Sequence, residues 1–75
     1  MINNRKELKN IRKNIGYNIY KARRCKGLTL KKLSEISNID FLLLDQFELG
    51  KNEVNLNILM RIANSLDVSM QDFLA

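Results

Sequence analysis

The sequence has no proline, no histidine and no tryptophan, and only three of its 75 residues are glycine. Turn-rich β structure relies on proline and glycine, so their scarcity favours helices. No apolar run approaches the roughly 18 residues that a membrane-spanning helix needs, and residues 1–10 lack the apolar core of a signal peptide. We therefore expect one all-α domain and no membrane partner. Its core is small, which favours a compact fold or an oligomer.

Cys25 is the only cysteine. It cannot form an internal disulfide, so a cytoplasmic protein is the simple interpretation. Its basic neighbours Arg24 and Lys26 could activate the thiol, but the sequence shows no base or orienting group, and an inert thiol is the simpler alternative. Metal-ligand clusters and phosphate-binding glycine loops are missing as well. We therefore expect no catalytic residue, no metal and no cofactor, and no enzyme.

Charge is divided unevenly along the chain. Residues 1–32 hold eleven Lys or Arg and one acid, for a charge of +10, whereas residues 33–75 hold two bases and seven acids, for −5. A basic half of this kind can hold a polyanion through phosphate contacts and counterion release. The alternative is a basic helix that is simply solvated.

Apolar residues at spacings of three and four predict one face of a first helix. They are Leu8, Ile11, Ile15, Ile19 and Ala22. Gly27 predicts the end of this helix as a left-handed C-cap. Its start is open, because four polar residues could each cap it: Asn3, Asn4, Asn10 and Asn14. Residues 1–13 are therefore a basic extension that is either frayed or continuous with the first helix, and residues 14–75 form the domain.

Two short helices follow, separated by a tight turn. Thr29 is a good N-cap for a second helix of about eight residues. Asn38 tolerates the positive φ of a turn. Asp40 then caps a third helix, residues 41–49, which Gly50 ends. Because only about three residues separate the two helices, they must cross at a large angle, which is the helix-turn-helix arrangement.

The rest of the chain predicts two more helices. Asn55 caps the fourth, whose inward residues are expected to be Leu56, Leu59, Ile62, Ala63 and Leu66. Ser69 caps a short fifth helix, in which Phe73 and Leu74 are expected to close the core. The fold class predicted is an all-α, compact five-helix domain.

From about residue 15 to residue 74 the sequence resembles the lambda-repressor-like (Xre-type) helix-turn-helix family. The resemblance rests on the order and spacing of several elements: "IG" at 15–16, Arg23, "KGLT" at 26–29, Leu33, "SNID" at 37–40, Leu44, Phe47, "E-x-G-K" at 48–51, "LMRIANSLDV" at 59–68 and "FL" at 73–74. It implies a third helix that enters the DNA major groove, and dimers that bind two-fold related half-sites. It also implies a structural ion pair between Arg23 and Glu48.

The resemblance places the base-reading side chains on the third helix, at Phe41, Leu42, Leu43, Asp45 and Gln46. Family members usually carry small or hydrogen-bonding residues at these positions. Here only Gln46 has the chemistry for bidentate recognition of adenine, while Asp45 can accept from cytosine N4 and Phe or Leu can contact thymine methyls. In the alternative interpretation, Phe41 and Leu43 fold back onto the second or fourth helix and are largely buried.

The remaining DNA-binding candidates lie at helix ends and loops. The family often has Gln at the start of the second helix, where this chain has Leu30, which cannot bind phosphate. Charge at this helix start would come instead from Lys31 and Lys32, which follow Leu30. The candidates for holding the DNA backbone are Lys31, Lys32, Lys51 and Asn55. Gln46 and Asn52 would reach phosphate or base. A solvated lysine pair is the alternative for Lys31 and Lys32.

Two functions fit these features. The first is sequence-specific binding of double-stranded DNA by a small transcriptional regulator that acts as a homodimer, with repression as the expected mode. The dimer would use the fifth helix, the amino-terminal extension or the apolar side of the third helix. The fifth helix is favoured, with Val68, Met70 and Phe73. In this hypothesis the segment 5–13 could act as an extra arm along the phosphates. The second is a protein-interaction module, antitoxin-like or anti-repressor-like, on the same scaffold, with Phe41, Leu42 and Leu49 as the contact.

Overall fold

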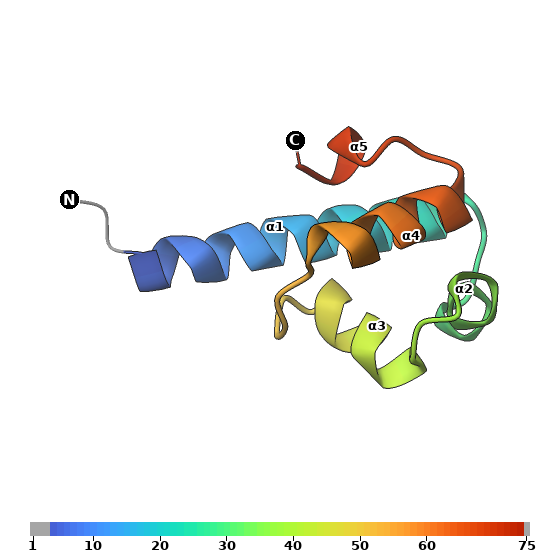
Figure 1. The fold of residues 1–75 in the computed structure, drawn as a ribbon, viewed down its shortest axis with the longest axis horizontal. Helices are drawn as coiled ribbons and strands as arrows, with labels where there is room; N and C mark the ends of the chain where they lie inside the picture. Colours follow the sequence, from blue (N-terminus) through green and yellow to red (C-terminus); the bar gives the residue numbers. More distant parts are fainter. Residues whose placement is uncertain (1–3, 75) are drawn as a thin grey trace.

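The computed structural model describes residues 4–74, which form five α-helices and no strand. The helices are α1 (Asn4–Cys25), α2 (Leu30–Ser37), α3 (Phe41–Glu48), α4 (Leu56–Leu66) and α5 (Gln71–Leu74). The all-α, five-helix prediction is confirmed. In Figure 1, α1 runs along the molecule with α4 beside it, α2 and α3 on one side and α5 on the other. Asn3, one candidate cap for the first helix, lies outside the described residues.

The predicted N-caps of α2, α3 and α4 are confirmed. Thr29 Oγ1 accepts from the Lys32 amide at 3.0 Å, and Asn55 Oδ1 accepts from the Ile58 amide at 2.8 Å. Asp40 Oδ2 accepts from two amides of α3, at 3.1 and 3.2 Å. These bonds satisfy amides at the start of each helix that have no partner within the helix. Local side-chain hydrogen bonds therefore fix where the two motif helices, α2 and α3, begin.

The turn between α2 and α3 is held from two sides. Asn38 adopts the left-handed conformation with φ 58° and ψ 36°, as its residue type allows. Ser34 Oγ donates to the Ile39 carbonyl at 2.6 Å, and Ile39 itself is buried. From α4, Arg61 Nη2 donates to the carbonyls of Ser37 and Asn38, each at 3.1 Å. The turn is thus anchored to the domain as well as to its own helices.

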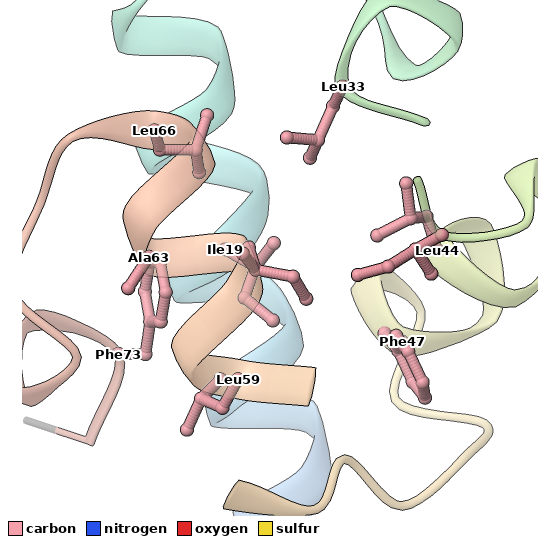
Figure 2. Packing of buried hydrophobic residues seen from close by; sticks show 10 residues of the cluster. Ile19, Leu33, Leu44, Phe47, Leu59, Ala63, Leu66 and Phe73 are labelled. Atoms are coloured by element: carbon pink, nitrogen blue, oxygen red, sulfur yellow. The ribbon is translucent and has the colours of Figure 1, made fainter. Parts of the chain in front are cut away.

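The core is formed by side chains of α1, α2, α3 and α4, and α5 closes it. Figure 2 shows Ile19 of α1 between the α4 side chains and the α3 side chains Leu44 and Phe47. Asn18 Nδ2 donates to the Phe73 carbonyl at 2.9 Å, which ties α5 to α1. The buried apolar residues are Ile19, Leu33, Ile39, Leu44, Phe47, Leu59, Ile62, Ala63, Leu66 and Phe73.

Two core predictions are wrong. Leu56 and Leu74 were expected to face inward, but they are 65% and 54% exposed. Leu56 lies at the first position of α4, at the edge of the buried stripe rather than at its centre. Leu74 is the last residue of α5 and follows Phe73, which fills the core; the step of about 100° between successive helix residues turns the Leu74 side chain towards solvent.

The amino-terminal end of α1 extends past the other helices (Figure 1). Along the predicted apolar face, Ile19 is buried and Ile15 and Ala22 are half-buried, whereas Leu8 and Ile11 are exposed. Residues 4–13 are helical and continue α1. No helix in the described part of the chain is both long enough and apolar enough to cross a membrane.

Candidate nucleic-acid interface

The third helix presents an outward side that is partly apolar. Phe41 is 44% exposed and Leu42 is 67% exposed, and Gln46 is exposed on the same helix. Leu43 is half-buried and packs against the core, and Asp45 is half-buried. Of the two residues that could have folded back, Leu43 therefore does so in part and Phe41 remains open to solvent.

Gln46 is held by the loop that follows its helix. Asn52 Nδ2 donates to Gln46 Oε1 at 2.6 Å, and the Lys51 amide donates to the Gln46 backbone carbonyl at 2.9 Å. The bond from Asn52 orients the side-chain amide of Gln46 before any ligand arrives. The Gln46 oxygen has a second lone pair and its NH₂ group has two donors, so the amide can still engage a base edge.

The candidates for contacts with the DNA backbone lie in the first turn of α2, in the loop after α3 and at the start of α4. Lys31 and Lys32 are exposed in the first turn of α2, where Lys32 Nζ lies 3.9 Å from Glu35 Oε1. Both partners of that pair are well exposed, so it contributes little. Asn55 uses its side-chain oxygen as the cap of α4, which leaves its NH₂ group as a donor. Lys51 is exposed in the loop after α3.

A buried ion pair fixes the orientation of α3. Arg23 Nε lies 2.7 Å from Glu48 Oε2, Arg23 Nη2 lies 3.0 Å from Glu48 Oε1, and Nη1 donates to the Leu28 carbonyl at 2.8 Å. The two side chains are only 10% and 7% exposed. This fork geometry joins the end of α1, the α1–α2 loop and the last turn of α3.

The same surroundings keep the Arg23 guanidinium charged. The hydrogen bond to Glu48 raises the pKa of Arg23 above its ordinary value, and burial acts in the opposite direction. The charges of Glu48, Tyr20 and Asp45 raise the pKa further.

Two features of the site were not predicted from the sequence. Arg61 was not assigned a role, although it and Lys51 are the only bases after residue 32, and it holds the turn of the motif. Leu49 was grouped with Phe41 and Leu42 as an apolar contact. In the structure Leu49 lines a hollow in which every charged side chain is a cation.

A short turn between two capped helices, with the second helix held by a buried ion pair and open to solvent on one side, defines a helix-turn-helix domain. Residues 19–73 match the helix-turn-helix family over more than half of the chain. The chain belongs to this family. Regulators of the family bind double-stranded DNA, and this places the chain among DNA-binding transcription regulators.

Three solved structures have the same fold. The clp gene regulator ClgR from Corynebacterium glutamicum gives a TM-score of 0.82 at 31% identity, over 85% of this chain and 82% of that one. The restriction-modification controller protein C.AhdI from Aeromonas hydrophila gives 0.80 at 24% identity, over 83% and 94% of the two chains. A transcriptional regulator from Vibrio cholerae gives 0.84 at 23% identity, over 88% of this chain and 37% of that one. The last two show the fold alone. Among curated protein sequences there is no significant match.

Proposed function

We propose that the protein binds a specific sequence of double-stranded DNA through α3 in the major groove and acts as a transcriptional repressor. The observation that carries this proposal is the hydrogen bond from Asn52, in the loop after α3, to the exposed Gln46 of α3, a helix that a buried ion pair ties to α1. Gln46 would read a base edge, with Phe41 and Leu42 against thymine methyls. Four donors would hold the DNA backbone: Lys31, Lys32, Lys51 and Asn55.

We infer that the protein acts as a homodimer on two half-sites. Phe73 is 1% exposed because it fills the core of its own domain, so it is not available to a second copy. This corrects the interface expected from the sequence. Of the expected residues, Val68 and Met70 remain as candidates, and both are half-buried against the core. To these we add Leu74 of α5, which is 54% exposed.

Selection of binding sites from random duplex DNA, at low and moderate salt, tests the proposal. We expect an enriched, AT-rich sequence with two inverted halves, since thymine methyls suit Phe41 and Leu42 and adenine suits Gln46. Inverted halves would report two bound copies. If no sequence is enriched at low salt, sequence-specific DNA binding is not the function of this surface.

Replacing Gln46 with Ala should relax the preference at one base position of each half-site. The loss should be about 1–3 kcal/mol of discrimination at that position, with little change elsewhere. Gln71→Ala is the matched control, because Gln71 is an exposed glutamine of α5, away from the motif. Competition binding with single-base variants of the selected site measures both. Equal effects of the two substitutions would argue against a base contact by Gln46.

A second candidate function is a protein contact at the adjacent exposed pair Phe41 and Leu42. The double substitution Phe41→Ser and Leu42→Ser separates the two functions. We expect DNA affinity to fall, because two apolar contacts with the groove are lost. Ile36→Ser with Met60→Ser is the control, since these residues are 48% and 47% exposed on α2 and α4. Unchanged DNA affinity together with loss of a protein complex would favour the second function.

A further inference from the structure

A basic hollow lies between the first half of α1 and the loop after α3. Figure 1 shows how these two backbone segments pass each other. It is lined by Arg5, Lys9, Arg12, Lys13, Leu49, Gly50 and Lys51. Five of these side chains are cations, and no acidic residue is among them. Side chains from two segments that are far apart in the sequence thus converge on one place.

The backbone fixes the positions of these side chains. Arg5, Lys9 and Lys13 recur every four residues on one helix, so they share a face. Gly50 has a positive φ of 72°, and a Cβ atom on it would lie 2.8 Å from Lys13 Cα. The loop therefore rests directly on α1 and brings Lys51 to the same hollow. The arrangement depends on the fold and not on flexible side chains alone.

The charge of Arg12 in the hollow is little compensated by its acidic partner. Arg12 Nη2 lies 3.8 Å from Glu53 Oε2, but the Glu53 side chain is 75% exposed, so the pair is weak. In the part of the chain that the structure describes, the buried Arg12 Nε has no hydrogen-bond acceptor. Like charges four residues apart on a helix destabilise it slightly. An anion in the hollow would offset both effects.

We propose that this hollow binds a phosphate of the DNA backbone that flanks the bases contacted by α3. The inference rests on the proposed function, because Lys51 lines the hollow and is followed directly by Asn52, the partner of Gln46. The four cations that α1 contributes precede residues 19–73, which match the family. The contact extends the bound length of DNA beyond the half-site.

The double substitution Arg5→Gln and Lys9→Gln, in the full chain, tests the hollow. Both residues are exposed on α1, so the fold should be retained, which circular dichroism verifies. Each phosphate contact contributes about 0.9 to the slope of log affinity against log salt. We expect the slope to fall by about 1 and the affinity at 0.1 M salt to fall by about 10-fold. The preferred base sequence should not change.

The control is Lys6→Gln with Lys21→Gln, which removes the same charge from α1 at residues that do not line the hollow. An equal loss of slope in the control would mean that only net charge matters, and the hollow would not be a site. A second part of the experiment uses DNA that is shortened on both flanks of the selected site. This should lower the slope of the natural protein to that of the variant and leave the variant unchanged.

The outcomes separate this inference from the proposed function. If the natural protein binds the selected site but neither the variant nor the shortened DNA changes the slope, the hollow does not bind DNA and the proposed function stands. If the natural protein binds no duplex DNA at low salt, both fail. If inorganic tripolyphosphate binds the hollow while the slope with DNA is unaffected, the site is for a free phosphate compound and the inference is overturned.

Discussion

Replacing Arg23 with Ala is expected to lower the free energy of unfolding by about 3–5 kcal/mol. The substitution leaves the Glu48 carboxylate, whose side chain is 7% exposed, without its cation. It also removes the donor to the Leu28 carbonyl. Small domains are stable by only about 5–15 kcal/mol, so the variant should be close to unfolding at room temperature. Urea denaturation followed by circular dichroism measures the change.

Three further variants test whether the loss of stability comes from the ion pair. Arg24→Ala removes an exposed arginine next in the chain and should change stability by less than about 0.5 kcal/mol. Arg23→Lys keeps the charge but loses the fork, so it should fall between the natural protein and Arg23→Ala. Removing both partners, Arg23→Ala with Glu48→Ala, should cost less than the sum of the single changes. A cost for Arg23→Ala no larger than that for Arg24→Ala would show that the pair contributes little.

Replacing Gly16 with Ala should destabilise the domain by about 1–3 kcal/mol, although Ala is the better helix former. A Cβ atom on Gly16 would lie 2.2 Å from the Phe47 carbonyl oxygen and 2.7 Å from that of Glu48. Both atoms belong to the backbone of α3, so they cannot turn aside as a side chain would. The helices must move apart, which also displaces the proposed DNA-binding surface.

Asn14→Ala, two residues earlier in the sequence, should have the opposite effect on stability. Asn14 is exposed on the same helix, and Ala has the higher helix propensity, so stability should rise by a few tenths of a kcal/mol. Thermal unfolding of the two variants under the same conditions gives the comparison. If Gly16→Ala also raises the melting temperature, the contact between α1 and α3 is not close.

Local chemistry accounts for the part of the fold that the sequence predicts. Thr29, Asp40 and Asn55 cap their helices through bonds to amides two or three residues away, so their type and position are informative without any tertiary contact. Leu56 was wrongly placed in the core because the period of a helix shows which face is apolar but not how far neighbouring helices cover it. The candidate site likewise has one part that the sequence predicts and one part that depends on the fold. Gln46 is visible from its residue type, whereas its bond to Asn52 follows from the path of the loop.

The basic hollow shows most clearly which contacts cannot be predicted from the sequence. The positive charge of residues 1–32 is visible in the composition. That Lys51 joins the cations of α1 depends on the close approach of Gly50 to Lys13, a contact between residues 37 positions apart in the sequence. Distances of that kind are set by packing of the whole domain, and no local pattern reports them.

The bonds from Arg61 to the carbonyls of Ser37 and Asn38 have a thermodynamic consequence for ligand binding. A turn that is already anchored to α4 loses little conformational entropy when a ligand contacts the helices on either side of it. Complex formation should then proceed without coupled folding. Its heat-capacity change should reflect the apolar area covered at the contact, without the larger contribution that ordering a disordered segment would add.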